Sequence, residues 1–231
     1  MKTDRRGWMA LTAAGLFAAL SGCGGGGSSG AAASAAAAGR QRGDLGAGAA
    51  QLNNLPLEAL SEAERDGLLA MREEEQLAHD VYAASAVLWT ALPIFGQIAN
   101  SETRHAAAVA DLLDRYAVPD PMDGVATGVF PTPAFQALFD ALAARSGIGL
   151  IEALQVGCEI EELDMRDIAE HLLAVDNADI RTVYENLLRG SRNHLRSFYA
   201  TLQQQGGSYI PLYLSQEAFD AIVTSAMEVG G

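Results

Sequence analysis

Residues 117–148 read AVPDPMDGVATGVFPTPAFQALFDALAARSGI and separate two pairs of helical sequence patterns. The stretch contains several glycines and four prolines, and proline breaks a continuous helix. A short amphipathic piece at residues 134–144 interrupts it. Residues 117–148 therefore predict a long crossing connection and not a tight turn. The prolines are Pro119, Pro121, Pro131 and Pro133.

Helical patterns lie on both sides of this connection. Before it, apolar residues recur at helical spacing over residues 61–89 and 98–116, and the first pattern opens with a capping box at Ser61 and Glu64. After it, residues 154–172 and 179–206 repeat the spacing, and residues 215–227 predict a short closing helix. Alanine, the strongest helix former, is abundant. The sequence predicts an all-α fold in which two antiparallel helices, a long crossover and two further helices form a four-helix bundle.

Charge and cysteine content exclude several classes of function. The chain has 231 residues, 15 Lys and Arg against 29 Asp and Glu, and a formal net charge of −14, so nucleic acid is a disfavoured partner. Its two cysteines are too few for a disulfide scaffold or a cysteine-rich metal cluster. Cys158 is predicted to be a buried, small apolar side chain.

The N-terminus has the pattern of an export signal. Basic residues at Lys2, Arg5 and Arg6 precede a short apolar run over residues 8–20, which is too short to span a bilayer. Leu20-Ser21-Gly22-Cys23 follows the run directly and resembles the bacterial lipobox, in which the cysteine is lipidated. An ordinary signal with a chance cysteine is the alternative.

The predicted organisation is a lipoprotein signal over residues 1–23, a tether over residues 24–54 and a folded domain over residues 55–231. The tether is rich in Gly, Ala and Ser and lacks the large apolar side chains that folding requires. We expect an exported, membrane-anchored protein on the periplasmic side, lipidated at Cys23. Gly24 stands where aspartate is associated with inner-membrane retention, which favours the outer membrane.

Each of the four long patterns carries polar residues inside its apolar stripe, where the core of a bundle should be apolar. Two of the helices carry ionisable pairs at i, i+3 spacing, which places both side chains on one helix face. Burying four carboxylates and two imidazoles without compensation costs several kcal/mol per charge. The six candidate ligands are Glu75, Glu102, His105, Glu161, Asp164 and His194.

Two metal ions would compensate these charges. One Glu from each of two helices and Glu-x-x-His from the other two form the di-metal carboxylate pattern of helix bundles. Oxygen-rich ligands with a few imidazoles suit iron or manganese better than zinc or copper, and iron is the preferred prediction.

Five segments resemble the ferritin and rubrerythrin superfamily, and more closely a ferritin-like bacterial and archaeal domain family of unknown function. The resemblance implies a ferritin-like bundle over about residues 55–228 in which Glu75, Glu102 with His105, Glu161 and His194 hold the metals. The chain departs from the pattern at Ser191, where the second Glu-x-x-His requires Glu. Either Asp164 supplies the missing carboxylate, or the site is asymmetric and holds one metal tightly. The segments are MREEEQLAHDVY (71–82), SETRH (101–105), IEELD (160–164), YENL with GSRNH (184–187, 190–194) and YLSQEAF (213–219).

The resemblance implies a di-iron protein that reacts with O2 or peroxide or oxidises ferrous iron. No Cys-x-x-Cys pair is present to carry electrons, so the reductant is external. The predicted partners are the membrane, the small oxidant or ferrous iron, and no nucleic acid; a homodimer is left open. The alternative function is a metal-free or metal-storing envelope module without catalysis.

Other acidic and histidine residues are predicted to lie outside the site. Glu73, Glu74 and Glu162 are expected to form a solvated face, although Glu162 replaces Glu161 if the helical register is shifted by one. His79 and His171 are also expected to be solvated.

Overall fold

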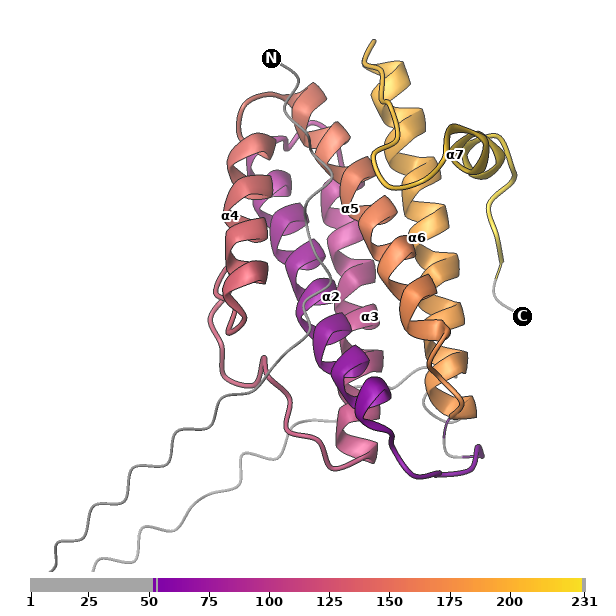
Figure 1. The fold of residues 1–231 in the computed structure, drawn as a ribbon. Helices are drawn as coiled ribbons and strands as arrows, with labels where there is room; N and C mark the ends of the chain where they lie inside the picture. Colours follow the sequence, from indigo (N-terminus) through magenta and orange to yellow (C-terminus); the bar gives the residue numbers. More distant parts are fainter. Residues whose placement is uncertain (1–51, 53, 230–231) are drawn as a thin grey trace, which may run out of the picture. The chain divides into compact units, whose positions relative to one another are not determined.

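The structure is a computed structural model that describes residue 52 and residues 54–229. The predicted signal, the lipidation cysteine Cys23 and all but the end of the predicted tether lie outside the described residues. The described part contains six α-helices and no strand, which confirms the all-α prediction (Figure 1). The helices are α2 (Glu62–Leu88), α3 (Ile94–Arg115), α4 (Pro133–Ser146), α5 (Leu150–Leu172), α6 (Ala178–Gln204) and α7 (Gln216–Val223).

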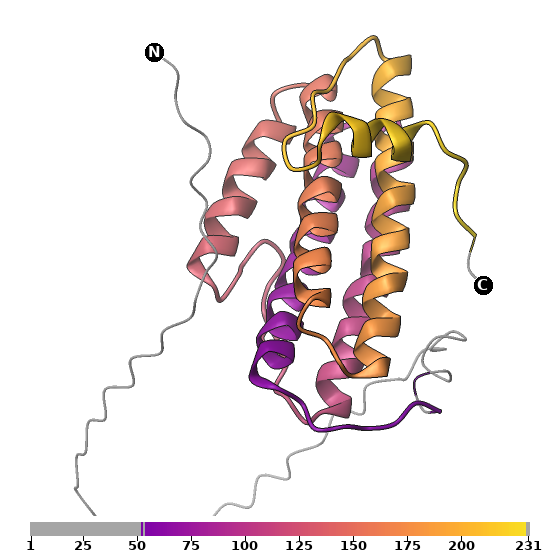
Figure 2. The same ribbon diagram turned by 45° about the vertical axis from the view of Figure 1, so that its right-hand side comes forward.

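The four long helices pack side by side, as in a bundle. Helix α2 packs against α3, α5 packs against α6, and the two pairs meet through α2 with α5 and α3 with α6. The connection between α3 and α5 returns along the bundle through α4, which packs against α2 and α5 (Figures 1 and 2). Helix α5 therefore begins at the same end of the bundle as α3 (Figure 1).

Local signals explain where the helices begin. Ser61 caps α2 as predicted, because its Oγ accepts a hydrogen bond from Glu64 N at 3.2 Å and Ser61 N donates to Glu64 Oε2 at 3.0 Å. Helix α3 begins directly after Pro93 and α5 directly after Gly149, each four residues before the predicted start. Proline suits the start of a helix because the first amide groups have no intrahelical acceptor.

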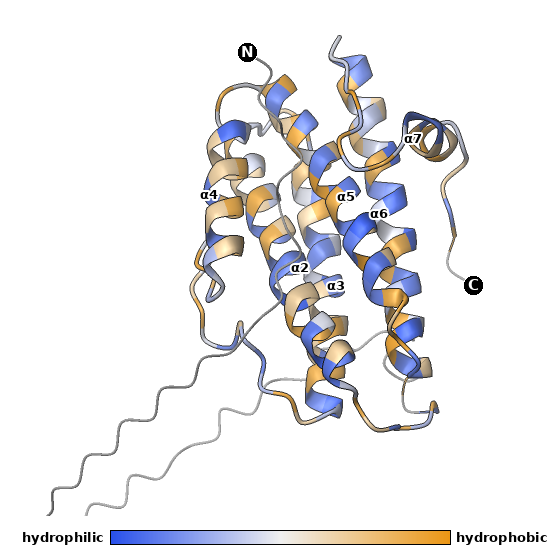
Figure 3. Ribbon diagram, in the orientation of Figure 1, coloured by the Kyte–Doolittle hydropathy of each residue, from blue (hydrophilic) through white to orange (hydrophobic). Residues whose placement is uncertain are grey.

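The core consists of two apolar layers with a polar layer between them. One apolar layer includes Leu77, Phe95, Leu154 and Phe198, and the other includes Leu68, Met71, Leu112, Val183 and Tyr184. On each long helix the candidate ligands are preceded in the sequence by a residue of one layer and followed by a residue of the other. Each helix accordingly alternates between hydrophobic and hydrophilic positions (Figure 3). The fold thus places the six candidates at one level of the bundle.

The C-terminal helix α7 packs across α6 (Figure 2). Its Phe219 is fully buried against the rings of Tyr199 and Tyr209, at centroid distances of 5.0 and 5.8 Å. The predicted closing helix is therefore present, and it is shorter than predicted. Cys158 is buried and unpaired, as predicted. None of the helices within the described residues is long and apolar enough to cross a membrane.

Candidate metal centre

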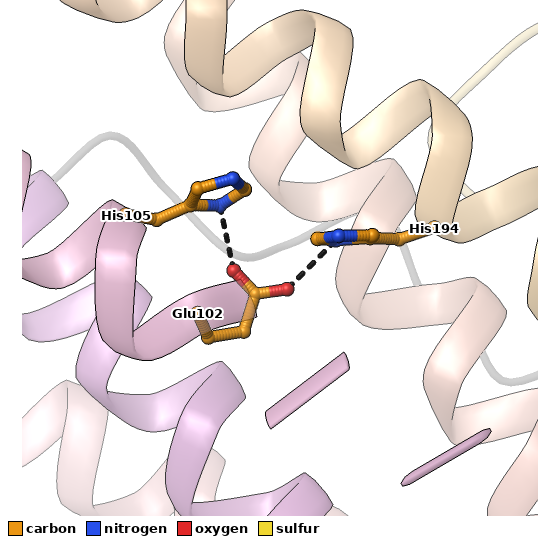
Figure 4. Close-up of side chains that lie close together, drawn as sticks. All are labelled: Glu102, His105 and His194. Carbon is orange, nitrogen blue, oxygen red and sulfur yellow. Dashed lines mark ion pairs between the residues drawn. The ribbon is translucent and has the colours of Figure 1, made fainter. Parts of the chain in front are cut away.

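Glu102 lies at the middle of the polar layer, between two imidazoles (Figure 4). Glu102 and His105 are one turn apart on α3, and His194 reaches the same point from α6. Glu102 Oε2 is 2.7 Å from His105 Nδ1, and Glu102 Oε1 is 2.8 Å from His194 Nδ1. One ligand atom from each of these three residues lies within 4.8 Å of the others, so the group could hold a metal ion.

Each imidazole also faces a second carboxylate. His105 Nδ1 is 3.4 Å from Glu75 Oε2 on α2, and His194 Nδ1 is 3.5 Å from Glu161 Oε2 on α5. The two imidazole rings are stacked, with centroids 5.3 Å apart. The centre therefore has two similar halves, each with one histidine and one outer carboxylate, and Glu102 is shared by both.

The close contacts of Glu102 lack hydrogen-bond geometry. His105 Nδ1, His194 Nδ1 and Glu102 Oε1 have no hydrogen-bond partner among the described residues, although two of the contacts are shorter than 3 Å. Glu75 Oε1 is likewise buried without a partner. Buried polar atoms are rarely left unsatisfied, and nitrogen and oxygen atoms gathered this closely fit a bound cation.

The electrostatics of the centre follow from burial and from these contacts. Burial raises the pKa of Glu75 to about 7, against the opposing effect of His105. Burial also opposes ionisation of Glu102, but the two imidazoles outweigh it and hold the pKa of Glu102 well below its usual range. Burial would lower the pKa of His194, but Glu161 and Glu102 raise it to about 10. Without bound metal, protons on the imidazoles and on Glu75 would thus neutralise part of the negative charge of the carboxylates.

Asp164 lies at the same level but is held by a different partner. The Ser191 hydroxyl donates a hydrogen bond to Asp164 Oδ2, and Asp164 Oδ1 is buried without a partner. Burial, together with Glu75 and Glu74, raises the pKa of Asp164 well above its usual value. Ser191, which stands where the di-metal pattern that the sequence resembles has Glu, is therefore in direct contact with the carboxylate that could replace that Glu.

No arginine or lysine forms an ion pair with Glu75 or Glu161 within residues 54–229. Glu161 Oε1 instead accepts a hydrogen bond of 2.6 Å from the Tyr82 hydroxyl. In a bundle that binds no metal, buried carboxylates are expected to pair with arginine or lysine. Their surroundings therefore favour the metal interpretation over the metal-free one.

Two glycines make room for the site, and sequence reasoning missed both. A Cβ on Gly190 of α6 would lie 2.5 Å from His105 Cε1 and 2.7 Å from its Nε2. A Cβ on Gly157 of α5 would lie 2.6 Å from the ring of Phe198, which packs on Tyr82 at a centroid distance of 4.9 Å. Each glycine lies inside a predicted helix, where glycine is unfavourable unless another group packs closely against it. This was the signal in the sequence that could have indicated a close approach.

The predicted solvated face is wrong. Glu73 and Glu74 are each 4% exposed, and Glu162 is fully buried. Glu162 accepts hydrogen bonds from Tyr209 and from two backbone amides of the loop after α6, and it is not in contact with either imidazole. Glu73 is covered by the connection after α3 and Glu162 by the loop after α6, and helical periodicity gives no signal for such covering segments.

The histidines outside the site are less solvated than predicted. His79 is partly buried and lies 2.8 Å from Asp80 Oδ1. His171 packs against the ring of Tyr184, and burial lowers its pKa. Neither lies in the polar centre, as predicted.

Comparison with known proteins agrees with this architecture. Residues 64–226 match DUF2202, a family described as an uncharacterized protein domain. The chain belongs to the DUF2202 family. An uncharacterized protein of Methanocaldococcus jannaschii, MJ0754, is 43% identical over 179 residues, which cover 78% of this chain and 96% of that protein. The crystal structure of hypothetical protein MJ0754 from Methanococcus jannaschii is similar, with a TM-score of 0.73 and 44% identity over 75% of this chain and 99% of that one. This DUF2202 chain therefore shares its fold with its archaeal relative.

Proposed function

We propose that this DUF2202 protein is a ferritin-like di-metal carboxylate protein that is redox-active toward O2, peroxide or ferrous iron. Iron is preferred over manganese, because the donor set is rich in carboxylate oxygen and contains two imidazoles. The single observation that carries the proposal is the sharing of Glu102 between two similar halves of one buried centre.

The number of charges supports two ions. Glu75, Glu102, Glu161 and Asp164 are all at most 6% exposed, and when ionised they carry four negative charges. Two divalent cations would neutralise them, whereas one would leave a net charge in a low-dielectric interior. In this proposal His105 and Glu75 would hold one ion, His194 and Glu161 would hold the other, and Glu102, which lies between the two imidazoles, would be available to both. Asp164, oriented by Ser191, supplies the carboxylate that position 191 lacks.

The protein side chains orient the ligands and keep the centre dry. Tyr82 fixes Glu161 through its hydroxyl, so that Glu161 Oε2 faces His194. The apolar layers on both sides of the centre exclude water, which strengthens electrostatic interactions within it. A bound pair of iron ions would supply the electrons for reduction of a small oxidant. Neither the sequence nor the described structure offers a thiolate electron-transfer site, so an external reductant belongs to the proposal.

The location of the protein is part of the proposal. Cleavage of the signal and lipidation of Cys23 would tether the domain to a membrane on the periplasmic side, with the outer membrane preferred. The chain would then act on oxidants or ferrous iron outside the cytoplasm.

Metal content measured by plasma mass spectrometry tests the proposal. We expect residues 24–231, purified without a histidine tag, to hold about two iron or manganese ions per chain. Glu102→Gln combined with His194→Gln is expected to remove them. Glu162→Gln is the matched control, because Glu162 is equally buried but is satisfied by Tyr209 and the loop after α6. The loaded protein is then assayed for consumption of peroxide and oxidation of ferrous iron.

The outcomes separate the two candidate functions. Failure to bind metal after reconstitution with ferrous or manganous salt would refute the di-metal centre. Two bound ions without turnover of peroxide or ferrous iron would favour the metal-storing module over the enzyme.

A further inference from the structure

Glu74 is a buried carboxylate on α2 that the proposed di-metal centre does not use. It is 4% exposed, and its Oε1 has no hydrogen-bond partner. Its neighbour Glu73 is equally buried but accepts hydrogen bonds from the Thr132 amide at 3.1 Å and from the Thr132 hydroxyl at 2.6 Å. A buried carboxylate oxygen without a donor is unfavourable unless it takes up a proton or a cation. Glu73 is therefore satisfied by the protein, whereas Glu74 has an oxygen atom available to a proton or a cation.

Two carboxylates of the neighbouring helix α5 belong to the same region as Glu74. Asp164 and Asp167 lie one turn apart on α5, which packs against α2. Burial raises the pKa of Glu74 well above its usual value, and the charges of Asp167 and Glu75 raise it further. Asp164 Oδ1 is buried without a partner, like Glu74 Oε1. Asp167, Glu74 and Asp164 are called the carboxylate row below. The side chain of Asp167 is 24% exposed, whereas Glu74 and Asp164 are at most 6% exposed, so Asp167 is the member of the row nearest to solvent.

An arginine occupies the outer end of this row. Arg166 donates two hydrogen bonds to Asp167, with Nε to Oδ1 at 2.6 Å and Nη2 to Oδ2 at 2.9 Å. Its guanidinium lies over the ring of Tyr213, at 4.7 Å from the centroid. The Arg166 side chain is 40% exposed, so solvent reaches the ion pair that it forms with Asp167. Arg166 supplies positive charge at the position where a cation from solvent would first meet the row.

We propose that Asp167, Glu74 and Asp164 form a transit site through which a hydrated divalent cation, such as ferrous or manganous ion, passes between solvent and the centre. Carboxylate oxygens are the preferred ligands of such ions, and two or three of them with retained water suffice to bind one. The incoming cation displaces Arg166 from Asp167, is held by Glu74, and is handed to Asp164 and Glu75. This inference rests on the proposed function, because a transit site needs a centre to serve.

The rate of metal loading tests the transit site. Metal-free residues 24–231 are mixed with manganous ion, and the electron paramagnetic resonance signal of free manganese is followed with time. We expect Glu74→Gln and Asp167→Asn to slow loading at least tenfold, while the final content equals that of the wild type. Glu73→Gln is the matched control and is expected to load at the wild-type rate. Arg166→Ala removes the competing cation and is expected to load faster.

Three results would overturn the transit site. Wild-type loading rates in Glu74→Gln would show that the ion does not pass this carboxylate, and the di-metal centre would stand. Slower loading in Arg166→Ala would contradict the displacement of Arg166. A wild-type chain that takes up no manganese at all would refute the proposed centre and the transit site together.

Discussion

Gly190→Ala is the substitution that most directly tests how the bundle positions His105. A Cβ at residue 190 would lie 2.5 Å from His105 Cε1, whereas ordinary contacts of this kind are 3.4–4 Å. The ring must therefore move by about 1 Å to restore normal contact. A metal site tolerates about 0.2 Å of change in its ligand distances, so a shift of this size would remove His105 from the proposed ligand set.

The expected loss of metal affinity follows from the shift of the ring and from the small tolerance of a metal site. Disturbance of groups that orient metal ligands lowers affinity by about 10–100-fold, which corresponds to about 1.4–2.8 kcal/mol. The effect should fall on the half of the centre that contains His105 and Glu75, so the affinity for one of the two proposed ions should decrease. Alanine also favours helix by about 1 kcal/mol over glycine, while overpacking costs about 1–3 kcal/mol. The free energy of unfolding of the metal-free protein should therefore fall by about 0–2 kcal/mol.

The assay is competition with a chelator for bound manganous or ferrous ion, together with urea unfolding of the metal-free protein. Gly96→Ala on α3 is the matched control, because a Cβ there meets only Ala86 Cβ, at 3.8 Å. This control should gain up to about 1 kcal/mol of stability and keep both ions. Wild-type affinity for both ions in Gly190→Ala would refute the reasoning.

Three further predictions concern the stability of the metal-free protein in urea. Tyr82→Phe leaves the buried Glu161 Oε1 without its donor and should lower the free energy of unfolding by about 1–3 kcal/mol, while Tyr199→Phe serves as control; an unchanged value would contradict the role of the hydroxyl. The carboxylates of Glu161 and Glu102 raise the pKa of His194 from 6.5 to about 10 despite burial, so its stabilisation is complete below pH 6.5 and is lost as the pH rises through 10. The free energy of unfolding should therefore fall over this range, and the same fall in His194→Gln would exclude His194 as its cause. Ser61→Ala removes the cap of α2 and should cost about 1 kcal/mol without changing metal affinity; a change in metal affinity would show that the cap acts on the centre.

The sequence predicted the long helices and the level of the polar layer, because both depend on local spacing. Apolar residues recurring every three to four positions determine which face of a helix is buried. A polar residue within such a stripe, such as Glu102 or His194, is then buried wherever the helix packs. The burial of these residues could therefore be predicted without knowing which residues surround them.

The remaining features depend on contacts between distant segments. Glu73 is buried because Thr132, 59 residues away, covers it. Glu162 is buried because the loop containing Tyr209 folds over α5. A side chain at residue 190 is excluded only because the ring of His105 from α3 occupies the space beside Gly190. No periodicity within one helix carries such information, so the sequence predicted a solvated acidic face where the structure has a covered one.

The buried carboxylates of this chain fall into two groups, and the difference between them bears on function. Glu73, Glu162 and Asp179 are satisfied by protein donors; Asp179, for example, accepts hydrogen bonds from Arg115 and Tyr116, each at 2.7 Å. Glu74, Glu75 and Asp164 each keep a buried oxygen that no donor reaches. If cations bind at these unsatisfied carboxylates as proposed, they would stabilise the native state, because a ligand that binds only the folded form adds its binding free energy to stability. Metal binding and the stability of the bundle should therefore be coupled.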